Sequence, residues 1–276
     1  MSNNQIDRQP LVTLLSDFGD RDVYVGIMKG VIAQINPRLT VVDLTHQIPP
    51  QDIAAARFSL MNAYAHFPVG TVHLAVVDPG VGGKRRAIAV EFAQGFLVGP
   101  DNGIFSGLLS QSPAIAAVEL TNLNYWRTPQ PSKTFHGRDI FAPVAANLAS
   151  GVPLKQLGQE IDPVSLVNLD IGNCKQTTIG VMGCIQYIDH FGNLVSNIPA
   201  SYVQGKTWCV QVAGLSVPGR ETYGEVKVGE IIALVGSHGW VEIAINYGDA
   251  HSQLQINLQD PLEVLFFSEN QTSEYC

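Results

Sequence analysis

Over the first 160 residues, short apolar runs alternate regularly with helix-like segments, a pattern that few folds accommodate. The apolar runs at 11–15, 40–44 and 71–77 have the composition of β-strands, and 71–77 is apolar almost throughout, as in a strand buried on both faces. Between them, residues 24–36 and 53–64 carry apolar side chains at helical spacing. Strands and helices that alternate in this way form a largely parallel, helix-covered sheet, so we predict a Rossmann-like α/β fold.

After about residue 165 the helical spacing disappears, and short strand-like runs follow, separated by Gly, Pro and Asn turns. This succession predicts a smaller antiparallel β-sheet or barrel with no helix. We therefore predict two domains, residues 1–165 and residues 166–276. The strand-like runs lie at 179–188, 208–212, 230–235, 241–245 and 261–267.

The charge balance limits the classes of partner. Sixteen Lys and Arg residues against twenty-four Asp and Glu give a formal net charge of −8, which repels polyphosphates and anionic surfaces. We therefore expect no nucleic acid and no membrane as a partner. The chain also lacks an apolar run of about 18 residues that could span a membrane, and its first eight residues lack the apolar stretch of a signal peptide. These features predict a cytoplasmic protein.

The cysteines and histidines give no indication of a metal cofactor. The four Cys residues form no CxxC pair, and the seven His residues include neither an HExxH nor an HxH pair. The chain has no GxSxG nucleophile elbow, so covalent acyl chemistry has no support either.

Polar residues follow three successive predicted strands at the point where each strand ends. They are Ser16 and Asp17, then Thr45 and His46, and then Asp78. Because the carboxyl ends of parallel strands meet at one edge of a sheet, where ligands bind in such folds, we expect a small-molecule site there.

Asp17 differs from the acidic residues that follow it. It comes directly after a predicted strand, where a carboxylate can accept hydrogen bonds from both hydroxyls of a ribose. Asp20 and Asp22 could contribute oxygens to a cation site. Capping of the next helix explains these two residues better.

Two further segments leave a structural and a functional interpretation open. The glycine-rich turn from Asp78 to Arg85 lacks the order of a phosphate-binding loop. It is either a tight turn with solvated cations or a bend in which Arg85 fixes the Asp78 carboxylate to align or deprotonate a water. His136 and Asp139 lie at the start of a helix predicted over 138–150. An isolated histidine is more often structural than catalytic, and surface capping explains Asp139.

The turn from Asp189 to Asn193 is similarly ambiguous. Its Gly and Asn satisfy the backbone of a turn, while its aromatic and polar side chains suit a purine ring.

Taken together, six segments of the chain resemble one family, the S-adenosylmethionine (SAM) hydroxide adenosyltransferases, which are related to the SAM-dependent chlorinases and fluorinases. The segments follow one another in order over nearly the whole chain, and their combination is specific although each alone is not. They are Leu-Ser-Asp17-Phe-Gly, Val-Asp-Leu-Thr-His46-Gln-Ile-Pro-Pro, Val-Asp78-Pro-Gly-Val-Gly with Arg85, Gly-Pro-Asp101-Asn-Gly, Phe-His136-Gly-Arg-Asp and Asp189-His-Phe-Gly-Asn193.

The resemblance implies an α/β amino domain that carries the catalytic set and a smaller β carboxy domain that contributes to adenine and methionine binding. It implies a homotrimer with each site between the amino domain of one subunit and the carboxy domain of the next. The implied activity is hydrolysis of SAM to adenosine and L-methionine, with SAM as substrate and no cofactor.

The same resemblance assigns roles to individual residues. The catalytic set falls on Asp78, Arg85 and His136, and the ribose-binding carboxylate falls on Asp17, beside Phe18. Asp249 stands where the family pattern leads us to expect asparagine. Contacts to adenine and methionine are implied for Asp189, Phe191, Asn193, Ser237, Glu242 and the backbone near Ala250.

Two positions separate a hydrolase from a halogenase within the resemblance. Fluorinases carry tyrosine at the position of Asp78 and serine at that of Gly137, and chlorinases also lack the carboxylate. Gln51 departs from the halogenases as well, since they carry tryptophan in that stretch. A carboxylate repels a halide but helps a water nucleophile, so we expect in-line attack of water on C5′ of SAM. The alternatives are a SAM-dependent chlorinase and a non-catalytic SAM or adenosine sensor.

Overall fold

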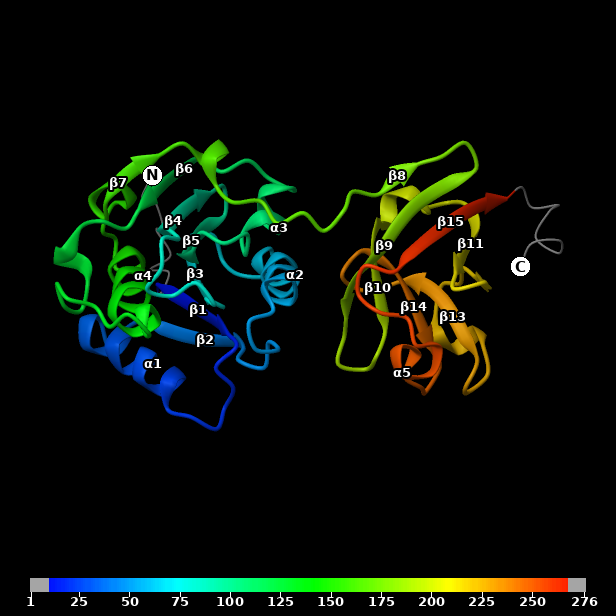
Figure 1. Ribbon diagram of the computed structural model, residues 1–276, viewed down its shortest axis with the longest axis horizontal. Helices are drawn as coiled ribbons and strands as arrows, with labels where there is room; N and C mark the ends of the chain where they lie inside the picture. The colour runs from blue at the N-terminus through cyan, green and yellow to red at the C-terminus, as the bar shows by residue number, and fades with distance from the viewer. Residues whose placement is uncertain (1–9, 268–276) are drawn as a thin grey trace, which may run out of the picture. The chain divides into compact units, whose positions relative to one another are not determined.

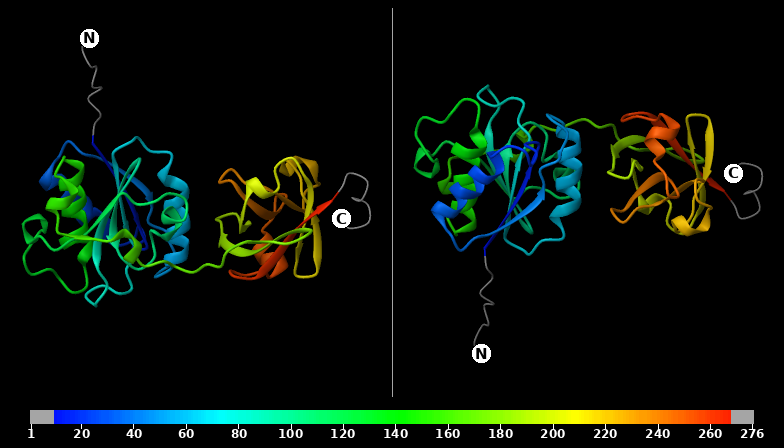
Figure 2. Two further views of the ribbon diagram at one scale, coloured as in Figure 1. Left: turned by 90° about the horizontal axis from the view of Figure 1, so that it is seen from above. Right: turned by 90° about the horizontal axis from the view of Figure 1, so that it is seen from below.

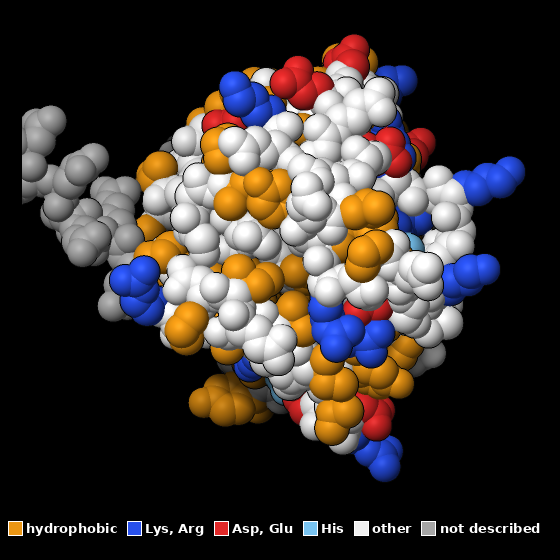
Figure 3. All heavy atoms as spheres, turned by 90° about the vertical axis from the view of Figure 1, so that its left-hand side faces the viewer, with side chains coloured by type: hydrophobic (Ala, Val, Ile, Leu, Met, Phe, Trp, Pro, Cys, Tyr) orange, Lys and Arg blue, Asp and Glu red, His pale blue; other side chains and the backbone are white. Residues whose placement is uncertain are grey.

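The computed structural model describes residues 10–267, and the chain divides into two compact units, at residues 169 and 170 (Figure 1). We call residues up to 169 unit 1 and residues from 170 unit 2. Within the described residues, no helix is long and apolar enough to cross a bilayer. On the face drawn in Figure 3, acidic and basic side chains are interspersed with apolar ones.

Unit 1 contains a seven-stranded sheet in the order β2-β1-β3-β5-β4-β6-β7. The first four strands of this order pair in parallel, and β4, β6 and β7 pair antiparallel. The predicted largely parallel α/β fold is therefore confirmed. The strands are β1 (Leu11–Ser16), β2 (Thr40–Thr45), β3 (Thr71–Val76), β4 (Ala87–Phe92), β5 (Gly95–Pro100), β6 (Ala116–Glu119) and β7 (Gln159–Ile161).

Helices cover both faces of this sheet. Figure 2 shows α1 and α4 on one face and α2 on the other. Every residue of β3 is buried, as expected of a strand with helices on both sides. The helices are α1 (Tyr24–Ile35), α2 (Ile53–Tyr64), α3 (Ser106–Leu109) and α4 (Ala142–Ala149). Short 3₁₀ turns are η1 (Leu123–Tyr125), η3 (Leu154–Gln156) and η4 (Pro163–Ser165).

The helix predicted over 138–150 begins differently from the expected pattern. Residues Gly137–Phe141 form a π-helical turn, η2, in which the Ala142 N–H bonds to the Gly137 carbonyl, and only then does α4 begin. Pro143 lies in the first turn of α4 and has no N–H to offer, which removes one regular helical hydrogen bond at this junction.

Unit 2 is an antiparallel sheet that nearly closes into a barrel, which confirms the predicted class. Its main path runs β12-β11-β15-β9-β10-β14-β13, with β8 paired to β9, and a bridge between Gly219 and Ala233 brings the two ends of the path together. The strands are β8 (Lys175–Gln176), β9 (Gly180–Ile188), β10 (Leu194–Pro199), β11 (Thr207–Val212), β12 (Leu215–Pro218), β13 (Ile231–Val235), β14 (Trp240–Ile245) and β15 (Pro261–Phe267).

One short helix in unit 2, α5 (Ala250–Leu254), contradicts the prediction that this part has none. Its N-cap is Asp249, which accepts a hydrogen bond from the Ser252 N–H at 2.8 Å. Five residues are too few to show helical periodicity in a sequence, whereas the cap supplies the local stabilisation. The unit also has two 3₁₀ turns, η5 (Ala200–Tyr202) and η6 (Tyr223–Glu225).

Candidate active site

A cavity of about 410 Å³ lies in unit 1 where β1 and β3 end. Its lining includes the loop after β1 with Asp17 and Phe18, the loop after β3 with Asp78, the segment before η2 with His136, and Gln51 from the loop before α2. The carboxyl ends of these parallel strands thus place residues from three distant parts of the sequence around one space.

Asp78 and Arg85 form a nearly buried ion pair behind this cavity. Arg85 Nε lies 2.9 Å from Oδ1 and 3.1 Å from Oδ2 of Asp78, and a terminal guanidinium nitrogen also donates to Oδ2. The side chains are 5% and 11% exposed. Oδ1 therefore accepts one of these hydrogen bonds and Oδ2 accepts two, so Oδ1 has the greater capacity for a further donor.

His136 is linked to the same guanidinium. Its Nδ1 lies 2.7 Å from a terminal nitrogen of Arg85. Because a guanidinium only donates, Nδ1 must be the acceptor, and the ring proton of neutral His136 is on Nε2. Burial lowers the pKa of His136, and Arg85 lowers it further against the opposing effect of Asp78 and Asp139. The cluster therefore favours a neutral imidazole that offers an Nε2–H.

A close backbone approach fixes the two segments that carry this cluster. Gly82, in the turn between Asp78 and Arg85, has a φ of 73°, and a Cβ added there would lie 2.2 Å from the Lys133 carbonyl oxygen. Only glycine fits that space and that backbone conformation. The turn is thereby held against the segment that leads to His136.

Asp139 is fully buried, so its interpretation as a surface cap is wrong. Its carboxylate accepts hydrogen bonds from the Arg138 side chain, both at 2.7 Å, and from the Ser132 N–H at 2.9 Å. Burial raises the pKa of Asp139, but Arg138 and the Ser132 N–H lower it by more, so the carboxyl is ionised. The residue holds together the loop that presents His136.

Asp17 and Phe18 line the same cavity. Asp17 Oδ2 accepts a hydrogen bond from the Gln51 N–H at 2.8 Å. Phe18 belongs to a cluster of three aromatic rings with Tyr24 and Phe135, whose centroids are 5.3 to 5.9 Å apart. Sequence reasoning missed the two partners of Phe18, because nothing in their local pattern separates a cavity wall from a core aromatic.

The remaining predicted residues belong to unit 2, and only some of them share a surface. Phe191 and Asn193 line a hollow of about 500 Å³, where Tyr223 and Tyr247 also lie. Phe191 is 73% exposed and Tyr247 92%. Neither tyrosine is among the predicted site residues.

Asp189 is used within its own turn. Its carboxylate accepts hydrogen bonds from the backbone of Phe191 and Asn193 at 2.8 and 2.9 Å and from the Asn193 amide at 2.9 Å. Asp189 therefore forms the turn, as the structural interpretation predicts, and its contact to adenine or methionine stays a prediction.

Glu242, Ser237 and Ala250 do not line that hollow. Glu242 is buried and accepts hydrogen bonds from Tyr223 Oη and, at 2.8 Å, from His238 Nε2. Burial and this carboxylate raise the pKa of Tyr223. Ser237 is exposed, and Ala250 is buried at the start of α5.

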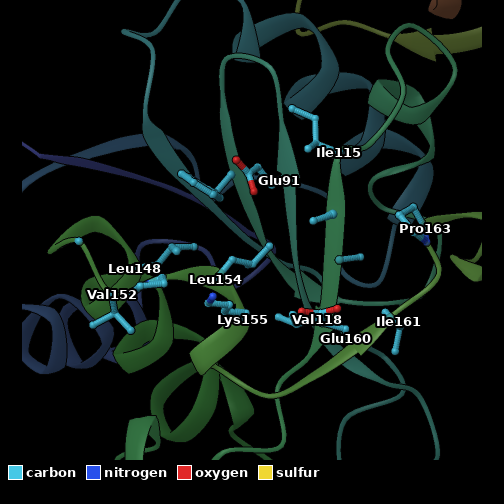
Figure 4. A pocket seen from close by; sticks show the side chains of 15 residues that line it. Glu91, Ile115, Val118, Leu148, Val152, Leu154, Lys155, Glu160, Ile161 and Pro163 are labelled. Carbon is cyan, nitrogen blue, oxygen red and sulfur yellow. The ribbon is translucent and has the colours of Figure 1, made fainter.

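A further hollow of about 720 Å³ in unit 1 lies away from the polar cluster (Figure 4). Its lining comes from β4–β7 and the segment after α4, is largely apolar, and contains none of the predicted site residues. Within residues 10–267, no group of three or more His, Cys, Asp or Glu side chains is placed to hold a metal ion.

Comparison with known proteins agrees with this arrangement. Residues 12–158 match the SAM hydroxide adenosyltransferase N-terminal domain, and residues 183–263 match the corresponding C-terminal domain. Proteins of Salinispora tropica and Thermus thermophilus named (R)-S-adenosyl-L-methionine hydrolase are each 40% identical to this chain. Their alignments cover 92% of it and 97% and 99% of the relatives.

A fluorinase and a solved structure are similar to this chain at lower sequence identity. A fluorinase of an Actinoplanes species is 26% identical over 86% of this chain and 91% of its own. The crystal structure of an uncharacterized conserved protein from Thermotoga maritima superposes with a TM-score of 0.86 at 34% identity, over 92% of this chain and 99% of that one. With both domains matched in order, the chain belongs to the SAM hydroxide adenosyltransferase family.

Proposed function

We propose that this chain hydrolyses SAM to adenosine and L-methionine by in-line attack of water on C5′. The observation that carries the proposal is the Asp78–Arg85–His136 cluster on a cavity that Asp17 also lines. In this proposal Asp17 binds the ribose hydroxyls and Phe18 packs beside them. Unit 1 thus supplies the catalytic set, and unit 2 contributes to adenine and methionine binding.

The chemistry follows from the polarity of the cluster. Water forms a bond to C5′ while the C5′–S bond breaks, and the sulfonium leaves as the neutral thioether of methionine. Asp78 Oδ1 accepts a proton of the attacking water, and the Nε2–H of His136 donates to the water oxygen and orients it. Arg85 holds the Asp78 carboxylate in place through its hydrogen bonds. Positioning of this kind is worth about 7–11 kcal/mol in well-oriented reactions.

The geometry favours water over a halide as the nucleophile. The Asp78 carboxylate repels an anion at the attack position. Gly137 offers no hydroxyl, and a Cβ added there would lie 3.1 Å from Met28 Sδ and 3.2 Å from the Phe135 ring. A side chain at this position therefore needs the Met28 and Phe135 side chains to shift by a few tenths of an ångström, and the glycine itself supplies no hydroxyl to hold a halide.

The names of the relatives point to one stereoisomer of the substrate. The Salinispora and Thermus proteins are named as hydrolases of the (R) form of SAM. We extend that substrate to this chain, and we also propose a homotrimer. Exposed apolar side chains on and before α1 are compatible with an oligomeric contact: Val23 is 71% exposed and Tyr24 46%.

The test is incubation of the purified protein with each sulfonium epimer, with and without chloride, followed by mass spectrometry. We expect adenosine and methionine from the (R) epimer in both samples, and an ¹⁸O label on the adenosine 5′-hydroxyl in heavy-oxygen water. A 5′-chloro nucleoside would instead establish the chlorinase, and unchanged SAM with measurable binding would establish the sensor. The Asp78→Ala variant serves as the matched catalytic control.

A further inference from the structure

A chain of polar contacts in unit 1 connects the start of the loop that carries Asp17 to the surface. The Phe18 N–H donates to Ser16 Oγ at 3.3 Å, and Ser16 Oγ lies 2.8 Å from His46 Nδ1. His46 Nε2 lies 3.1 Å from Asp43 Oδ1, in a contact bent away from ideal hydrogen-bond geometry. Lys29 Nζ donates to the other Asp43 oxygen at 2.5 Å.

The donors and acceptors of this chain fit one protonation pattern. Since Ser16 Oγ accepts from a backbone N–H, its own proton is free to point to His46 Nδ1, which places the ring proton on Nε2. Nε2 is the ring nitrogen nearer Asp43, at 3.1 Å from Oδ1. Burial raises the pKa of Asp43, but Lys29 and His46 lower it by more, so the carboxylate is ionised and selects this tautomer of His46.

The order of serine, histidine and aspartate resembles that of a hydrolytic triad, but the serine cannot act as a nucleophile. Ser16 is 1% exposed, and its Oγ already accepts a backbone hydrogen bond. The three residues therefore have a structural role.

What they hold is the loop that carries Asp17. His46 contacts this loop on both sides of Asp17: through its ring to Ser16, and through its backbone carbonyl, which accepts the Gly19 N–H at 2.8 Å. A third bond from the same segment, the Gln51 N–H, ends on the Asp17 carboxylate itself. The loop therefore depends on His46 for its position.

We propose that the His46 side chain is a positioning residue for the substrate ribose, acting through Ser16 on the loop that carries the Asp17 carboxylate. This inference rests on the proposed role of Asp17 in ribose binding. Its consequence is that loss of the His46 ring weakens recognition of the ribose hydroxyls while leaving the adenine contacts and the catalytic cluster intact.

The test measures the dissociation constants of adenosine and 2′,3′-dideoxyadenosine in the full-length protein by calorimetry. The dissociation constant of 2′,3′-dideoxyadenosine divided by that of adenosine measures the contribution of the ribose hydroxyls alone, and this ratio does not change when a variant is merely less folded. We expect His46→Ala to lower this ratio about tenfold, the worth of one hydrogen bond to a charged group. Ser16→Ala should act in the same direction, and His46→Asn, which keeps an acceptor near the Nδ1 position, should restore most of the ratio.

A matched control exists in the same sheet. His73 Nδ1 lies 2.8 Å from Thr13 Oγ1, another buried imidazole–hydroxyl pair, but three residues earlier along β1. His73→Ala should reduce stability and leave the ratio unchanged. An unchanged ratio in both His46→Ala and Ser16→Ala would overturn the inference while SAM hydrolysis by the unmodified protein still supports the proposed function. If the unmodified protein does not distinguish the two nucleosides, the ribose role of Asp17 is wrong and the inference falls with it.

Discussion

Removal of the Asp78 carboxylate should lower both the turnover rate and the free energy of unfolding. In the Asp78→Ala variant, Arg85 loses the acceptor of three hydrogen bonds while its side chain is only 11% exposed. Breaking a buried pair on one side costs about 3–5 kcal/mol in the free energy of unfolding, because the remaining charge is uncompensated. Loss of a general base lowers turnover by about 10²–10⁴-fold.

A second variant distinguishes these two effects. In Asp78→Ala combined with Arg85→Met, both charges leave the protein together, and an apolar side chain replaces the guanidinium. Because replacing both members of a buried pair is often neutral for stability, most of the lost unfolding free energy should return. Turnover should stay at the level of the single variant, because the acceptor for the water proton is still missing.

The assays are adenosine release from SAM under saturating substrate and urea unfolding of each variant at pH 7. SAM binding, measured by calorimetry, should remain in the single variant, since the ribose contact is assigned to Asp17. Turnover of Asp78→Ala within a factor of about three of the original would refute the role of Asp78 as acceptor, against the expected loss of at least a hundredfold. Equal stability of the single and double variants would refute the claim that the pair is effectively buried.

Three further predictions concern single residues. Asp17→Asn should raise KM for SAM about tenfold with little change in kcat, whereas Asp22→Asn, an exposed acid of the same loop, should change neither in the same steady-state assay. Burial lowers the pKa of His73 to about 4, so between pH 6.5 and 4 this histidine is protonated in the unfolded chain and neutral in the folded one. Urea unfolding should therefore show that the free energy of unfolding falls by about 3 kcal/mol over this range. The His73→Gln variant should not show this part of the loss. The lowered pKa of His136 keeps its ring neutral below the usual titration range of histidine, so a pH–rate profile of kcat should stay level through about pH 6.5 and fall only at lower pH.

The fold class was predictable because strand and helix periodicity are local properties of the sequence. The rule that ligands bind at the carboxyl ends of parallel strands also placed Asp17 and Asp78 on one edge, and both line the same cavity. Helix α5 escaped prediction, since a side-chain cap defines it and not a period. The burial of Asp139 escaped as well, because its partners Arg138 and Ser132 act through a loop whose path depends on the whole unit.

The close approach of Gly82 to the Lys133 carbonyl makes the proposed catalytic cluster sensitive to added volume at one position. The ion pair between Asp78 and Arg85 is nearly buried, so dissolved salt screens it only weakly. The backbone approach carries no charge and responds only to volume. A single methyl group at position 82 would therefore push the turn from Asp78 to Arg85 away from the segment that leads to His136, while leaving all three side chains chemically intact.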